Sequence, residues 1–509
     1  MPTERERNTL LEARAAAALE VGGRLRAGPS ERLIQTVFRR ELEEQLGLSE
    51  AMSRVDLAHT LGMMEAGIVP PEPGRELLAA LLALQANPAD FVPDPARGDL
   101  YTNREAWLCA RTSAAGWLGA GRARREAATT AFLMRVREGL LDLAAALAAT
   151  GLALTARARE FRGALMTDYT YLLSAQPTSL GHYLLGFAYP MRRDLDRLRA
   201  LYARVNRSPA GCGSTNGSRL PQHRERLAER LGFDGLVIHA RDAMWEPDLP
   251  IETGGMLAAI LINLDRLAED LQIFATEEFG LVELDDRHAR ASKIMPQKKN
   301  PFALTHVRGL ANAMIGQLAA GAAAGRTPSG QPDNRLALYG SIPRAIDDTR
   351  DAVALMGEVL ECLAVDRTRA SARLEHSFAL AADLAEILVL ECGLNVREAH
   401  RLTGHLVRRH LADGNFGRVT PEGLAEAAVE ALGLRVELPA AVLRDVLNPA
   451  AALAARTEPG GAAVEAIDSM LLECERGFLA ADAWGSGRRG CLAAADETLL
   501  DQIRTAATR

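Results

Sequence analysis

One short loop in the second half of the chain carries residue types suited to abstracting a proton. It has the sequence ASKIMPQKKNP and covers residues 291–301. The Ser292 hydroxyl precedes the Lys298 ammonium and the Asn300 carboxamide, and two prolines interrupt the run. Proline removes a backbone donor and ends regular structure, so the segment is predicted to be a loop. Such a loop would suit closure over an anionic substrate, although a solvated basic turn would have a similar composition.

A resemblance to a known family distinguishes these interpretations. The run MPQKKNP resembles the signature loop of the aspartase/fumarase superfamily, and in particular its argininosuccinate lyase branch. The resemblance implies that Ser292 is the base that removes a proton beside a carboxylate, with Lys298 and Asn300 as the family's lysine and asparagine. Two positions differ: Lys293 stands where the family usually has a second serine, and Thr305 stands where it usually has a glutamate.

A cluster of arginines forms the second candidate segment, with the sequence GRARRE at residues 121–126. It resembles the family's substrate-binding run GRSRND. Arg122, Arg124 and Arg125 would bind carboxylates well, because each guanidinium offers a bidentate fork. The alternative is a solvated, positively charged helix start. Helix N-termini prefer negative charge, and a bound anion would remove that conflict, so the pattern favours a binding site.

Two further segments resemble parts of the family's active site. The run DLYTNRE places Asn103 in an element of the active-site rim, with Tyr101 at the usual histidine position. The run TYLLSAQP resembles the family's THLQRAQP element. There the resemblance implies that Thr170 holds a substrate carboxylate, that Gln176 is retained, and that Tyr171 replaces the histidine usually proposed as the proton donor. A glycine-rich run, GCGSTNG at residues 211–217, stands at the position of a Gly-Ser-rich family loop.

The resemblance fails where the family grips the amino-acid part of its substrate. The tyrosine, glutamine and lysine of the family's YNRDLQEDK run correspond to Asp333, Leu338 and Ser341. The fumarate end of the site is therefore predicted to be retained and the amine end to be rebuilt. Arg125 and Lys293 are candidates for binding carboxylates on the amine.

Composition excludes several other classes of protein. The chain has 509 residues, of which 48% are hydrophobic and 25% charged, as expected for a globular protein of about three domains. A net charge of −7 gives no basic field for nucleic acid, and no membrane-spanning apolar run is expected. Six scattered cysteines without a CxxC pair favour reduced thiols and a cytoplasmic location. The acidic residues at 277–286 lack EF-hand spacing, so we predict no metal and no cofactor.

Long helices must position these segments. Apolar residues recur at the spacing of one helix face over 132–147, 195–205 and 260–271, which predicts an all-α helical bundle. The resemblance implies three mostly helical domains, which we place at residues 1–120, 121–370 and 371–509. It further implies a homotetramer, in which long helices of four subunits form one bundle and each active site takes residues from three subunits.

The chemistry predicted from these residues is a β-elimination. Removing a proton next to a carboxylate builds a doubly charged aci-carboxylate, which fixed donors stabilise. The product would be fumarate plus an amine, released from an N-substituted aspartate, with Tyr171, a water or the already protonated amine supplying the last proton. Two alternatives remain open: a true argininosuccinate lyase, or an inactive relative with a binding or structural role.

Overall fold

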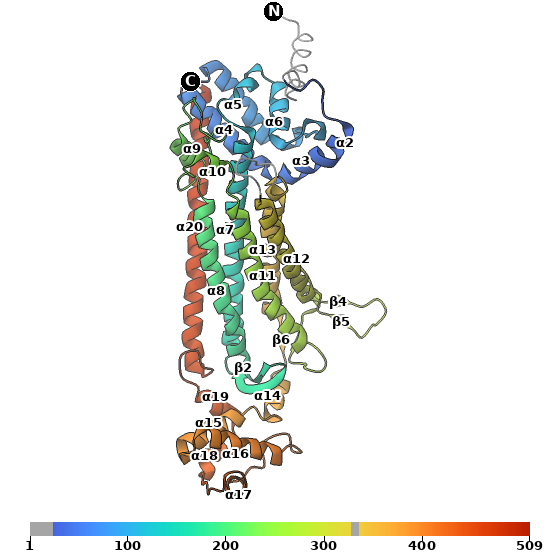
Figure 1. Cartoon of the computed structure of the whole chain (residues 1–509), viewed down its shortest axis with the longest axis vertical. Helices are drawn as coiled ribbons and strands as arrows, with labels where there is room; N and C mark the ends of the chain where they lie inside the picture. Colours follow the sequence, from blue (N-terminus) through green and yellow to red (C-terminus); the bar gives the residue numbers. More distant parts are fainter. Residues whose placement is uncertain (1–23, 327–334, 509) are drawn as a thin grey trace, which may run out of the picture.

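The computed structural model describes residues 24–326 and 335–508 and has a long bundle of helices at its centre (Figure 1). The predicted all-α fold is confirmed, since the described strands are short and pair only two at a time. The bundle consists of α7 (Arg124–Glu160), α8 (Leu180–Val205), α11 (Asp248–Phe274), α12 (Phe302–Gly325), α13 (Leu338–Cys362) and α20 (Val464–Thr508).

The longest of the early helices, α7, forms the centre of the core. It packs against α8, α13 and α20, and the predicted apolar positions from Phe132 to Leu147 are buried. By length and composition alone α7 would suffice to cross a membrane, but 61% of its most apolar window is buried inside the protein. That burial is the pattern of a core helix, because its apolar face is already covered by neighbouring helices.

Smaller helices cover one end of the bundle (Figure 1). Most of them lie between residues 31 and 109, and two short ones lie in the connection between α8 and α11. They bury Leu57, Leu77 and Leu81 in the same core as the bundle. Their bounds are α2 (Glu31–Leu33), α3 (Arg39–Gln45), α4 (Ser49–Glu65), α5 (Pro71–Ala86), α6 (Leu100–Cys109), α9 (Arg224–Arg230) and α10 (Ala240–Met244).

A separate helical unit lies at the other end of the bundle (Figure 1). Its own core is built from residues between Leu384 and Val446. The unit and the helix leading to it comprise α14 (Arg367–Glu375), α15 (Ala381–Cys392), α16 (Val396–Arg409), α17 (Pro421–Leu432), α18 (Ala440–Val446) and α19 (Pro449–Ala454).

The predicted C-terminal domain of residues 371–509 therefore needs a correction. Helix α20 leaves the small unit and runs back along α7 and α8 to the opposite end of the bundle (Figure 1). Its residues Ile467, Phe478 and Ile503 are fully buried in the main core. The physical reason is the apolar face of this helix, which the small unit does not cover and the bundle does.

Within the part of the chain that the structure describes, three two-stranded sheets join the long helices. They are β1 (Leu165–Thr170) with β2 (Leu173–Ser179), β3 (Val282–Glu283) with β6 (Ala364–Val365), and β4 (Arg290–Ala291) with β5 (Lys299–Asn300). All three pairs are antiparallel. The first and the last carry the two predicted substrate loops.

Candidate active site

The predicted catalytic loop is the tip of a short hairpin. Strands β4 and β5 pair Arg290 with Asn300, and the Asn300 carboxamide donates to the Arg290 carbonyl at 2.8 Å. At the base, the Lys299 ammonium binds the carboxylates of Glu283 (2.9 Å) and Asp286 (2.8 Å). Figure 1 shows the hairpin projecting away from the bundle. The base is thus held by ion pairs, whereas the loop that begins at Ser292 extends beyond the bundle.

The Ser292 hydroxyl oxygen is the acceptor for two backbone amides of its own loop. The N–H of Met295 donates to it at 3.0 Å and the N–H of Ile294 at 3.4 Å. Two N–H dipoles aimed at one oxygen stabilise negative charge there. A serine acts as a base only when its oxyanion is stabilised, so this geometry favours the predicted role.

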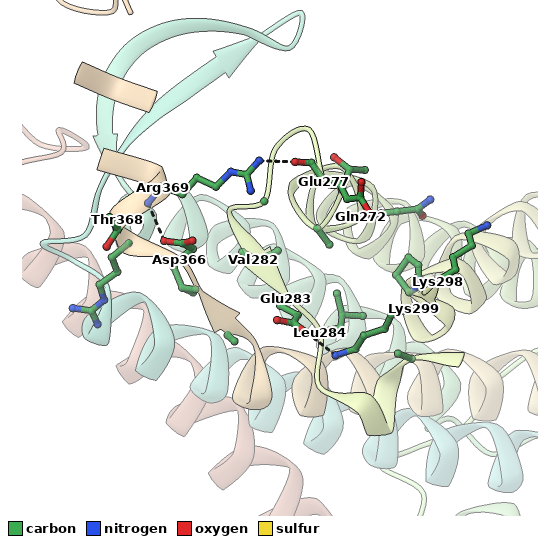
Figure 2. A pocket seen from close by; sticks show the side chains of 18 of the residues that line it. Gln272, Glu277, Val282, Glu283, Leu284, Lys298, Lys299, Asp366, Thr368 and Arg369 are labelled. Carbon is green, nitrogen blue, oxygen red and sulfur yellow. Dashed lines mark hydrogen bonds and ion pairs between the residues drawn. The ribbon is translucent and has the colours of Figure 1, made fainter. Parts of the chain in front are cut away.

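A cleft of about 1070 Å³ opens beside the hairpin (Figure 2). Lys298 lines it from the loop, Gln272 from the end of α11, and Arg369 from α14. The guanidinium of Arg369 donates to the Glu277 carbonyl, as Figure 2 shows, and therefore holds the wall of the cleft. Lys298 is exposed, so a small anion can reach its side chain from solvent.

The second predicted loop, at Thr170 and Tyr171, is the turn of the β1–β2 hairpin. Tyr171 and Leu172 have φ of 54° and 61°, in the left-handed region, and the Tyr171 side chain is 99% exposed. Thr170 and Gln176 are also exposed. Tyr169 lies one pair below the turn and packs on the rings of Phe274 and Phe279, so the hairpin is held just beneath its exposed turn.

The arginines of the third segment differ sharply in exposure. Arg122 is buried: its guanidinium donates to the Asp56 carboxylate at 2.8 Å and to the Leu118 carbonyl at 3.2 Å. The same Asp56 carboxylate binds Arg104 at 2.9 Å. Arg122 therefore holds the N-terminal helices together, and its burial opposes the predicted direct contact with a ligand.

Arg124 and Arg125 lie nearer the surface. The Arg125 guanidinium binds Glu41 at 2.7 Å, whereas the Arg124 side chain is 41% exposed and its Nε lies 3.5 Å from Asp99. The Asn103 carboxamide donates to the carbonyls of Gly98 and Asp99. Both amide hydrogens of Asn103 are used in this way. Asn103 is therefore better placed to hold the backbone at Asp99, which lies beside Arg124, than to contact a ligand as predicted.

At the predicted amine end, Leu338 is buried at the start of α13, and the Ser341 hydroxyl accepts a hydrogen bond from Gln317 at 3.0 Å. Asp333 lies outside the described residues. Lys293 is exposed at the tip of the catalytic loop. Leu338 and Ser341 thus stand where the resemblance led us to expect a glutamine and a lysine.

Within one chain the three segments do not meet. Helix α7 begins at Arg124 and has 37 residues, which at about 1.5 Å per residue separates Arg124 from the β1–β2 hairpin by roughly 55 Å. Helix α11 has 27 residues and likewise carries the chain about 40 Å away from the arginine end before the catalytic loop begins. Figure 1 shows the loop, the hairpin and the N-terminal helices at separate places on the bundle.

Two buried carboxylates of this region did not emerge from the sequence. Asp56 holds Arg104 and Arg122, and Glu126 accepts hydrogen bonds from the backbone amides of Gly211 and Gly213. The available signal for Glu126 was an acidic residue in the first turn of an apolar helix beside an arginine cluster. No local pattern indicated that Asp56 pairs with Arg122, because Asp56 lies 66 residues earlier in the chain.

Comparison with known proteins gives the family. Residues 98–316 match the lyase family model, and residues 378–454 match the model of the argininosuccinate lyase C-terminal region. Argininosuccinate lyase from Methanoculleus marisnigri is 32% identical over 475 residues, covering 92% of this chain and 95% of that protein. The enzyme of the same name from Methanothermobacter thermautotrophicus is 30% identical, with coverages of 87% and 96%. The chain belongs to the argininosuccinate lyase branch of the aspartase/fumarase superfamily.

Solved structures of this superfamily agree with that assignment. A variant of EDDS lyase with bound fumarate superposes with a TM-score of 0.85 at 29% identity, covering 95% of this chain and 96% of the other. EDDS lyase in complex with formate gives 0.84 at 28% identity, with coverages of 96% and 98%. The predicted family is confirmed. These relatives support a carbon–nitrogen lyase of the fumarate lyase type that acts on a small carboxylate.

Proposed function

We propose that this lyase cleaves or forms the C–N bond of an N-substituted aspartate, giving fumarate and an amine, and that its substrate is not argininosuccinate. The observation that carries the proposal is the Ser292 oxygen held by two loop amides. Asp333, Leu338 and Ser341 replace the three residues that the family is expected to use for binding arginine, which supports a different amine. EDDS lyase is a structural neighbour, so EDDS and other amines that carry carboxylates are the first substrates to test.

In the proposed mechanism, the Ser292 oxyanion takes a proton from the carbon next to a substrate carboxylate. The electron pair moves onto that carboxylate and forms an aci-carboxylate, which Lys298, Asn300, Thr170 and Arg124 stabilise as donors. Collapse of this intermediate breaks the C–N bond and leaves fumarate. The departing amine receives a proton from Tyr171, from water, or leaves already protonated.

The proposal includes a homotetramer with shared active sites. The segments that carry Ser292, Thr170 and Arg124 lie on different parts of one chain, so only a second and a third chain can complete a site. The exposed and strained turn at Tyr171 supports this, because a tip that contacts little of its own chain is suited to enter a neighbour. A cytoplasmic location remains a prediction.

The decisive experiment combines a substrate screen with one substitution. The protein is incubated with fumarate and a panel of amines, and separately with argininosuccinate and EDDS, and products are identified by mass spectrometry. Ser292→Ala is expected to lower turnover by roughly a thousandfold or more, because the base is removed. Ser469→Ala, on the exposed face of α20, is a matched control and should leave turnover unchanged.

The outcomes separate the alternatives. Efficient release of fumarate from argininosuccinate would instead make the protein an argininosuccinate lyase. Turnover of no N-substituted aspartate, together with no change in melting temperature on adding fumarate, would favour the inactive relative. Near-normal turnover by the Ser292→Ala variant would contradict the mechanism.

A further inference from the structure

Glu126 in the first turn of α7 ties two distant parts of the chain together. It is 1% exposed, and its two carboxylate oxygens accept the backbone N–H groups of Gly211 and Gly213, each at 2.7 Å. The N–H of Ala123 donates back to the Gly213 carbonyl at 3.1 Å. The start of α7 is therefore joined to the glycine-rich loop by hydrogen bonds in both directions.

The loop from Gly211 to Gly217 has little freedom to move on its inner side. Gly211 and Gly213 have φ of 74° and 71°, and a Cβ at Gly213 would lie 2.7 Å from the Gly217 carbonyl oxygen. Cys212 between them is fully buried in a small apolar cluster. Both positions favour glycine because of this conformation, and at Gly213 the close backbone contact leaves no room for any other residue.

The outer side of the loop carries hydrogen-bonding groups that face solvent. Ser214 and Asn216 are exposed and Thr215 is half-buried. The hydrogen bond between Ala123 and Gly213 places the next residue of each segment, Arg124 and Ser214, on neighbouring stretches of backbone. Hydroxyl and carboxamide donors next to a guanidinium suit a carboxylate, which has two oxygens and about four acceptor positions.

We propose that Glu126 is a positioning residue, which holds the glycine-rich loop so that Ser214, Thr215 and Asn216 bind a substrate carboxylate beside Arg124. The inference rests on the proposed function for the identity of the substrate, a dicarboxylate or an amine that carries carboxylates. Glu126 itself touches no substrate, because it is buried beneath the loop.

The two hydrogen bonds that Glu126 accepts from Gly211 and Gly213 depend on its charge. An ionised carboxylate accepts both amides, whereas a protonated one turns an oxygen into a donor and loses one of them. Burial raises the pKa of Glu126 to about 7, while Arg122, the two loop amides and Arg224 act in the opposite direction. The buried thiol of Cys212 faces the same carboxylate, and burial raises the pKa of that thiol to about 12, so it stays neutral near pH 7. Protonation of Glu126 therefore loosens the loop as the pH falls through about 7.

The test measures binding of succinate to the full-length protein by titration calorimetry between about pH 6.5 and about pH 8.5, a window that spans the Glu126 transition. Wild-type binding is expected to weaken towards the lower pH. Glu126→Gln should weaken binding roughly tenfold at the higher pH and remove most of the pH dependence, since a carboxamide cannot accept both amides. Glu229→Gln, on the exposed side of α9, is the matched control and should behave as wild type.

A second variant separates positioning from mere stability. Asn216→Ala leaves the hydrogen bonds between Glu126 and the loop intact and should weaken succinate binding without lowering the melting temperature. If Glu126→Gln and Asn216→Ala both bind succinate as wild type does, even with a lower melting temperature, the inference is overturned. A wild-type protein that fails to bind succinate also overturns it. Failure of the proposed function looks different: no N-substituted aspartate would be cleaved, yet succinate would still bind and respond to Glu126→Gln.

The same variants show which part of the substrate carries the carboxylate that the loop binds. Weaker binding of fumarate in Asn216→Ala would assign the loop to the four-carbon end of the substrate. Unchanged fumarate binding, with succinate binding still weakened and a higher KM for the amine once it is known from the screen, would assign it to the amine end. Either result supports the carboxylate site.

Discussion

Mixing two inactive variants should restore activity, because the proposed active site takes residues from several chains. The perturbation is a pair of single substitutions, Ser292→Ala and Arg124→Ala. The catalytic loop begins beyond the end of α11, a helix of 27 residues, or about 40 Å, that starts near the arginine end of the bundle. One small dicarboxylate cannot reach both side chains over that distance within one chain.

The expected recovery follows from counting chains. Each shared site needs a Ser292 loop from one chain and an Arg124 from another. When the two variants assemble at random in equal amounts, half of the loops and half of the arginines are intact, so about a quarter of the sites contain both. If each chain formed its own site, no site in the mixture would be intact and the activity would stay at the level of the separate variants.

The assay refolds the two variants together and compares turnover with that of each variant refolded alone. The control is wild type refolded with the Ser292→Ala/Arg124→Ala double variant. Shared sites predict about a quarter of full activity here as well, whereas sites within one chain predict about a half. Absence of recovery in the first mixture, with half activity in the control, would refute the shared site and the reasoning from helix lengths.

Two further predictions concern stability. Phe478 of α20 is fully buried against Gly151 of α7, so Phe478→Ala should leave a cavity and lower the free energy of unfolding by about 3–5 kcal/mol, measured by chemical denaturation; a change below about 1 kcal/mol would contradict the placement of α20 in the core. Asn395 forms a capping box with Glu398 at the start of α16. Asn395→Ala should therefore lower the free energy of unfolding by about 1 kcal/mol, measured as a lower melting temperature of the small unit. Asn415→Ala, in a turn after α16, serves as the comparison.

The sequence allowed prediction of the features that depend on local pattern. Buried positions recur along α7 as the helical spacing requires, and the long motif around Ser292 identified both the loop and the family. The position of the catalytic loop as an exposed hairpin tip agrees with its two prolines. These features are encoded within short stretches, so the helical spacing and a resemblance to one known motif are enough to find them.

The role of Arg122 depends on a residue far away in the chain, whereas that of Asn103 depends on the start of its own helix. As three closely spaced arginines, Arg122, Arg124 and Arg125 looked equivalent, but Asp56 on α4 draws only the first into the interior. The carboxamide of Asn103 is used by carbonyls at the start of its own helix. Sequence spacing predicts which side chains are near one another, but it does not predict which of them a distant carboxylate will bury.

The C-terminal tail shows the same limit at the level of a whole helix. Residues beyond Ala481 carry no motif, and small residues interrupt their apolar pattern. In the structure Trp484 packs edge-on against Tyr202 of α8, with ring centroids 5.3 Å apart, and Phe478 fills the space left by a glycine of α7. The complementary surface lies more than 250 residues earlier, so only the folded bundle gives α20 its place.

The outer surface of α12 gives a physical reason for the proposed tetramer. Small or apolar residues make up most of this helix, yet only a few of its 24 residues are buried, and Ile315 is 50% exposed. Burying such a face against a second copy of the helix would remove apolar surface from water, which favours association. Because the Ser292 loop directly precedes α12, the same contact would bring the loop to a neighbouring chain. Association and catalysis would then depend on one surface, so a charged residue at Ile315 should lower both together.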